Sequence, residues 1–178
     1  MRLADGHLQF TVTEVSPTKS PATSLNLDKI AANFELLDDW EDRFTYLIEL
    51  GRKLPAMHEA DKTEANRVHG CQATVYMKPT LHTNPARVEL SAAADAATVC
   101  GLIAILLTMY SGKSPGEILG IDAEGYFARL GLEDHLSPTR RNGLHSMIAR
   151  IRSIAQAARH AARCRTQIEN HRGASHRV

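Results

Sequence analysis

The residue best placed to do chemistry in this chain is Cys71, which directly follows Gly70 in the segment Asn66-Arg67-Val68-His69-Gly70-Cys71-Gln72. A glycine there lets the backbone turn and leaves space beside the sulfur. The segment joins a polar stretch to a strand-like run, so we expect a loop that presents the thiol. Arg67 and His69 could favour the thiolate if they fold back toward it. Cys71 is therefore a candidate nucleophile or soft ligand.

The other two cysteines are weaker candidates. Cys100 lies in an apolar helical run and is expected to pack in the core, and Cys164 is expected to be incidental in a basic segment. The three positions contain no CxxC spacing, which excludes a zinc ribbon or a thioredoxin-type dithiol. They do not resemble a secreted disulfide framework either. We therefore expect free thiols in a reducing cytoplasm.

A second chemical anomaly lies near the start of the last predicted helix. If Ser137 caps this helix, Arg140 and Arg141 oppose its macrodipole at about 0.3–1 kcal/mol each. Solvation, an anion or an acidic partner would offset that cost. Gly143 follows inside the helix, where glycine costs about 1 kcal/mol relative to alanine. Close packing against another backbone would explain this glycine.

Composition and organisation bound the class of protein. The chain has 178 residues, 43% hydrophobic and 23% charged, and these values are ordinary for one globular domain with a core. A net charge of +1 predicts no global attraction to nucleic acid or membrane. The longest apolar run, Leu102 to Leu107, is far below the roughly 20 residues of a membrane span. We also expect no secretory signal at the start of the chain.

Three segments are predicted along the chain. Residues 1–24 should be a mostly mobile extension, in which Leu8 to Val12 could pair as an edge strand. Residues 25–158 form the predicted domain. Residues 159–178 form a basic tail, where five arginines and one glutamate give five minus one, or +4. We expect a fraying helical extension there, with a role toward an acidic partner surface as the alternative.

Helical periodicity dominates the predicted domain. Asn26 can cap the first helix, the second should begin near Asp39, and Gly51 should end the second. The segment Asp95 to Tyr110 is apolar nearly all round, so it should be the buried centre. Gly112 should end this central helix, and Ser114-Pro115-Gly116-Glu117 has the spacing of a capping box for the next one. A short helix is expected between Asp122 and Gly131. The last long helix should begin at Ser137-Pro138, and its predicted core side chains are Leu144, Met147, Ile148, Ile151 and Ile154.

The hydrophobic period changes to two from Gln72. We predict strands over Gln72–Lys78, Thr80–Thr83 and Arg87–Ala92, with a turn at Asn84-Pro85. These strands would form a small antiparallel meander packed on the helices. The fold class is then α+β with two layers.

Five motifs in this order resemble the SufE family, whose members accept sulfur from cysteine desulfurases in iron–sulfur cluster assembly. The resemblance runs from about Asp38 to Ile154, and its motifs are Tyr46 to Pro55, Asn66 to Gln72, Gly101 to Leu107, Tyr110 to Gly112 and Gly131 to Leu144. It implies a SufE/IscU-like fold, a monomer or weak homodimer, and no cofactor of its own. The partner would be a cysteine desulfurase of the SufS or CsdA type, which carries the PLP.

The resemblance also implies roles for individual residues. Cys71 would take up sulfur as a persulfide, stimulate the desulfurase and pass sulfur to an iron–sulfur scaffold, as a non-classical sulfurtransferase. Gly70, His69 and Gln72 would support the loop. Arg140 matches the family's Ser-Pro-x-Arg motif, which favours a site or interface role, and Asn66 flanks the acceptor. The chain departs from many members at Tyr76, where they have Trp, and at Gln72, where they have Ser.

Two other classes of function stay open. An iron–sulfur or metal-binding scaffold of the IscU type would need several thiolates that converge on one site. A cysteine hydrolase or transferase would need an activated pair such as Cys71 and His69, for which the spacing is weak support.

Overall fold

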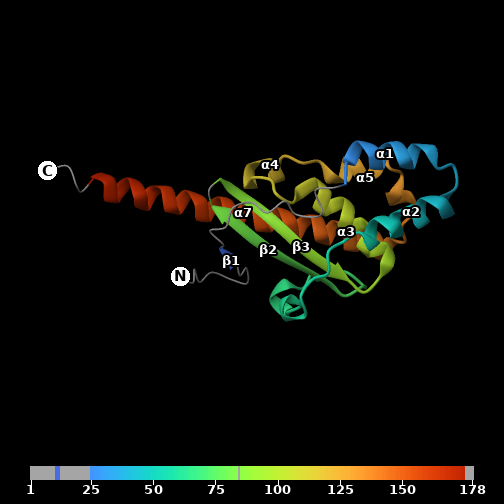
Figure 1. The fold of residues 1–178 in the computed structure, drawn as a ribbon, viewed down its shortest axis with the longest axis horizontal. Helices are drawn as coiled ribbons and strands as arrows, with labels where there is room; N and C mark the ends of the chain where they lie inside the picture. Colours follow the sequence, from blue (N-terminus) through green and yellow to red (C-terminus); the bar gives the residue numbers. More distant parts are fainter. Residues whose placement is uncertain (1–10, 13–24, 84, 175–178) are drawn as a thin grey trace.

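The computed structural model describes residues 11–12, 25–83 and 85–174, with side chains for 25–83 and 85–163. The expected mobility of residues 1–24 falls, apart from Thr11 and Val12, outside these residues, as does the end of the basic tail. A β-hairpin is covered by helices packed across it (Figure 1). The predicted α+β class is confirmed.

The sheet is a long hairpin with one short extra strand. β2 (Val75–Thr83) pairs antiparallel with β3 (Ala86–Ala94) along its whole length, from Val75↔Ala94 to Thr83↔Ala86. β1 (Thr11–Val12) pairs parallel with β2 at Thr80 and Leu81, so the expected edge strand is confirmed at these two residues. Pro85 lies in the hairpin turn, and Asn84 lies outside the described residues.

The prediction of three separate strands in this region is wrong, because two of them form one strand. The segments expected at 72–78 and 80–83 are one strand, which begins at Val75 and not at Gln72. It continues through Pro79, which pairs with Leu90. A proline ring fixes φ near −65°, which an extended strand tolerates, and only one ladder donor is lost. Gln72 and Ala73 form a bend in the preceding loop instead.

The starts of three helices agree with the sequence signals. Asn26 accepts from the Asp28 and Lys29 amides, Asp39 accepts from the Glu41 amide, and Ser114 with Glu117 forms the full capping box. The helices are α1 (Leu27–Leu36), α2 (Trp40–Arg52), α3 (Ala97–Tyr110), α4 (Pro115–Leu119), α5 (Ala123–Arg129), α6 (Leu132–His135) and α7 (Pro138–Ala174). Two 3₁₀ turns, Glu59–Asp61 and Glu64–Asn66, lie between α2 and β2.

The buried centre is α3, and α2 packs on it backbone to backbone. A Cβ added to Gly101 would lie 2.2 Å from the Leu47 carbonyl oxygen, and one added to Gly51 would lie 2.7 Å from the Gly101 nitrogen. The expectation that Gly51 ends α2 is therefore wrong. The helix continues to Arg52, and Gly51 serves the close approach of α3.

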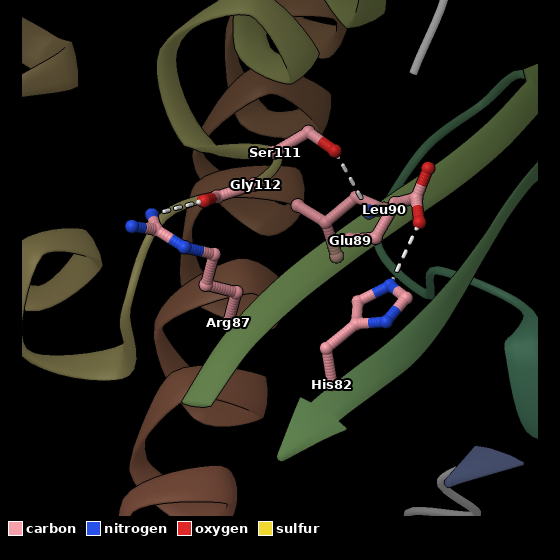
Figure 2. Close-up of polar contacts among 6 residues, drawn as sticks. All are labelled: His82, Arg87, Glu89, Leu90, Ser111 and Gly112. Atoms are coloured by element: carbon pink, nitrogen blue, oxygen red, sulfur yellow. Dashed lines mark hydrogen bonds and ion pairs between the residues drawn. The ribbon is translucent and has the colours of Figure 1, made fainter. Parts of the chain in front are cut away.

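The segment after α3 fastens the helices to β3, as Figure 2 shows. The Ser111 hydroxyl accepts from the Leu90 amide at 3.0 Å, and Arg87 donates to the Gly112 carbonyl oxygen at 2.8 Å. Gly112 has a φ of +78°, which ends α3 as predicted. These contacts fix the edge of β3 against the helical layer.

The long helix α7 lies across the hairpin and contacts β2, β3, α3 and α4. Its predicted core side chains, Leu144, Met147, Ile148, Ile151 and Ile154, are all buried. Beyond residue 158 the helix backbone continues to Ala174 and extends past the hairpin (Figure 1). Within the part of the chain that the structure describes, no helix combines the length and apolar character that crossing a membrane requires.

Candidate functional site

Cys71 lies in a tight loop that closes on itself. The Val68 amide donates to the Val75 carbonyl oxygen at 2.9 Å, and Arg67 forms an isolated antiparallel bridge with Tyr76. These contacts form the stem of what we term the acceptor loop, residues 69–74. Gly70 has a φ of +88°, a conformation that side chains other than glycine rarely adopt. The loop expected from the sequence is confirmed, with glycine as its turning point.

The sulfur of Cys71 rests on α7. Cys71 is half-buried, and its thiol donates to the Gly143 carbonyl oxygen at 3.4 Å. A Cβ on Gly143 would lie 3.3 Å from the Cys71 sulfur and 3.7 Å from its Cα. The close packing expected at Gly143 is therefore confirmed, and the partner is Cys71 itself.

Gly70 is required by its surroundings as well as by its backbone conformation. A Cβ at this position would lie 2.5 Å from the Ser146 hydroxyl oxygen. Gly143 and Ser146 thus contact consecutive residues of the acceptor loop. The loop lies flat on one face of the helix because two glycines remove the atoms that would hold it away.

Polar contacts hold the stem of the loop. Asn66 donates to the Asp61 carbonyl oxygen at 2.7 Å, and the Asp61 carboxylate pairs with Lys78 of β2 at 2.7 Å. At the other end, the Thr74 amide donates to the Asp95 carboxylate at 3.0 Å. Asn66 therefore stabilises the segment that precedes the loop.

The electrostatic environment favours a protonated Cys71. Burial raises the pKa of the Cys71 thiol above 9.0, and no cation among the described residues counteracts it. Arg67 and His69 pair instead with the Glu64 carboxylate, at 3.5 and 3.3 Å. The condition under which these two residues would favour the thiolate is not met in this conformation, because both side chains contact the Glu64 carboxylate instead.

The remaining predicted site residues lie on the surface. His69 and Gln72 are exposed on the acceptor loop. Arg140 is exposed in the first turn of α7, and no partner of its guanidinium is found among the described residues. Their supporting and interface roles stay predictions.

Arg141 differs from its neighbour. Its guanidinium donates twice to the Glu133 carbonyl oxygen, at 3.1 and 2.7 Å, so it ties α7 to α6. Contact with a carbonyl oxygen therefore offsets the unfavourable position of Arg141 at a helix N-terminus.

His135 at the end of α6 stacks on Trp40 with ring centroids 3.3 Å apart.

The other thiols have separate surroundings. Cys100 is half-buried and donates to the Ala94 carbonyl oxygen at 3.4 Å, while its Cβ lies against Gly51. The Cys164 side chain lies outside the described residues. Among the side chains that the structure describes, no three of His, Cys, Asp or Glu gather in a group that could hold a metal ion.

Three contacts of the acceptor loop were not predicted. Ser146, Arg150 and Asp95 all touch the loop or its stem. The spacing of Gly143, Ser146 and Arg150 at i, i+3 and i+7 marks one helix face. No sequence signal indicates that this face meets residues more than 70 positions earlier.

The fold and site together define a small α+β protein whose loop cysteine is held on its longest helix. The family described as "SufE: Fe-S metabolism associated domain" matches residues 28–155. An uncharacterized SufE-like protein of Rhizobium meliloti is 44% identical over 133 residues, which is 74% of this chain and 95% of that protein. One of Rhizobium etli is 44% identical over 74% of this chain and 90% of its own length.

A solved structure agrees with these sequence matches. The solution structure of a hypothetical protein from Thermus thermophilus has a TM-score of 0.60 and 26% identity, and it covers 74% of this chain and 94% of its own. The chain belongs to the SufE family, a family associated with iron–sulfur metabolism.

Proposed function

We propose that this protein accepts sulfane sulfur on Cys71 from a PLP-dependent cysteine desulfurase, stimulates that enzyme, and passes the sulfur on for iron–sulfur cluster assembly. Membership of the SufE family supports a role in iron–sulfur metabolism. The observation that carries the specific role is Cys71 itself, a half-buried thiol on a loop that turns at Gly70 and packs on Gly143. A transferred sulfur needs a thiol that can be both withdrawn and presented, and a loop can supply both positions.

The proposed chemistry is thiol exchange. The Cys71 thiolate attacks the outer sulfur of a persulfide on the desulfurase, which forms a new S–S bond at Cys71 and breaks the S–S bond of the donor. The donor cysteine leaves as a thiolate and takes up the proton that Cys71 released. No outside oxidant or reductant is needed, because the sulfane sulfur moves between two equivalent thiols. Stimulation follows because the donor cysteine is freed for another turnover.

The resting geometry shapes this exchange. Docked on α7, the Cys71 thiol is protonated and donates a hydrogen bond, so it is a poor nucleophile. Attack therefore requires that the loop leave Gly143 and enter the donor site, where the thiol can ionise. The exposed His69, Gln72 and Arg140 would meet the partner, and the PLP stays with that partner. A reducing cytoplasm would keep the thiol free.

Intact mass measurement tests the proposal. After incubation with a desulfurase and cysteine, the protein should gain the mass of one sulfur atom, removable by a thiol reductant, and the desulfurase should turn over faster. Cys71→Ser should show neither effect. Cys100→Ser is the matched control and should load normally, because Cys100 lies in separate surroundings. Full stimulation by Cys71→Ser would contradict the sulfur-transfer mechanism.

A further inference from the structure

Arg150 links α7 to the stem of the acceptor loop. Its guanidinium Nη2 donates to the Ala65 carbonyl oxygen at 2.7 Å in a partly buried contact. Ala65 lies in the 3₁₀ turn Glu64–Asn66, directly before the Arg67↔Tyr76 bridge that closes the stem. Arg150 therefore holds the segment from which the loop departs.

The contact belongs to a row of three on one face of α7. Gly143 meets Cys71, Ser146 meets Gly70, and Arg150 meets Ala65. Seven residues of helix span about 10 Å, so the loop and its stem lie along two turns of α7. Arg150 is the member of this row whose side chain donates a hydrogen bond to the segment around the loop.

The energetics of Arg150 are balanced between opposing effects. A charge-assisted hydrogen bond to a carbonyl oxygen is stabilising. However, the Arg150 Nε is buried with no hydrogen-bond partner, and burial lowers the pKa of the guanidinium. No carboxylate among the described residues forms an ion pair with it. A buried, unpartnered donor is costly, and undocking would return it to water. The contact therefore stabilises the docked stem only weakly.

We propose that Arg150 is a positioning residue for sulfur transfer, whose contact with the Ala65 carbonyl sets the fraction of molecules in which the acceptor loop is docked on α7. The inference rests on the proposed function for its role in transfer, but loop docking itself can be measured without a partner. Arg150 does not touch the sulfur. It acts through the stem, and the position of the stem determines the position of the loop that carries Cys71.

Alkylation of Cys71 by iodoacetamide tests the docking. Each cysteine is quantified separately by peptide mass spectrometry, so Cys100 reports general loosening of the fold. Arg150→Met keeps the aliphatic volume and loses the hydrogen bond, and Cys71 alkylation should rise about threefold to tenfold with Cys100 unchanged. Arg150→Lys keeps a charged donor and should stay within about twofold of wild type. Arg152→Met is the matched control on the same helix, since Arg152 faces Glu124 at 3.6 Å.

Desulfurase stimulation supplies a second measurement. If the undocked loop is the form that reacts with the desulfurase, Arg150→Met should lower the concentration of this protein that gives half-maximal stimulation of the desulfurase. The factor should equal the rise in Cys71 alkylation, and the maximal rate of the desulfurase should be unchanged. An unchanged Cys71 alkylation rate, or an equal rise at Cys71 and Cys100, would overturn the proposal and leave Arg150 a structural residue. Absence of sulfur on wild-type Cys71 would instead refute the proposed function, while the alkylation result would still decide the docking.

Discussion

Replacing Gly143 by alanine would test the packing of Cys71 on α7 directly. The added Cβ would lie 3.3 Å from the Cys71 sulfur and 3.7 Å from the Cys71 Cα and Cβ. The first distance is tighter than most Cβ contacts, so Cys71 must move by a few tenths of an ångström. Because Cys71 lies on a loop whereas Gly143 lies inside α7, we expect the loop and not the helix to give way.

Two opposing free energies determine the outcome. Alanine in place of glycine inside a helix stabilises by about 0.8–1 kcal/mol. Strain of about 1 kcal/mol in the docked loop would increase the undocked population about fivefold. We therefore expect a free energy of unfolding that is unchanged or higher by up to about 1 kcal/mol, together with about fivefold faster alkylation of Cys71.

Gly116→Ala is the control for helix propensity alone. Gly116 lies in α4, and a Cβ there meets nothing within 4 Å. This variant should gain stability without any change at Cys71. Unfolding in urea gives the free energies, and iodoacetamide gives the alkylation rates. If Gly143→Ala gains the full stability and Cys71 reacts at the wild-type rate, the docking of Cys71 on α7 is wrong.

Two further predictions concern ionisation and packing. Because burial favours the neutral thiol, Cys71 alkylation should reach half its maximal rate above pH 9.0, the ordinary thiol value. The raised pKa of Cys71 stabilises the folded state at pH values below the unfolded-state pKa, and this stabilisation is lost as pH rises through the folded-state pKa. The free energy of unfolding in urea of wild type, relative to that of Cys71→Ala, should therefore fall above about pH 9. Gly101→Ala would place a Cβ 2.2 Å from the Leu47 carbonyl oxygen, and it should cost about 3 kcal/mol in unfolding free energy. Gly120→Ala, whose Cβ would meet only ordinary contacts at 3.6 Å and beyond, should cost far less, and equal losses would contradict the close α2–α3 packing.

Much of the helical layer could be predicted because its signals are local. Asn26 and Ser114 cap the helices that they were expected to cap, and the helix expected to begin near Asp39 does begin there. The side chains from Leu144 to Ile154 that repeat at helical spacing are buried. Strand boundaries were predicted less well. Pro79 resembles a break in the sequence, yet pairing with β3 carries the strand through it, and such pairing is set by residues distant in the chain.

The candidate site was predicted in part. Cys71, its loop and the packed glycine at Gly143 follow from residue types and spacing. The ionisation of Cys71 does not, because it depends on how the neighbouring charges are shared. Arg67 and His69 are close to Cys71 in sequence, but Glu64 binds both. Burial against α7 then decides the sign of the pKa shift.

Local motifs and their order along the chain were enough to predict a loop around Gly70 and Cys71 in a domain that resembles the SufE family. The resting place of that loop became visible only in the folded molecule. Gly143, Ser146 and Arg150 meet residues 71, 70 and 65 across more than 70 positions of chain. Such contacts exist only after the hairpin, the central helix and α7 have packed together, since burial and close approach are properties of the assembled core.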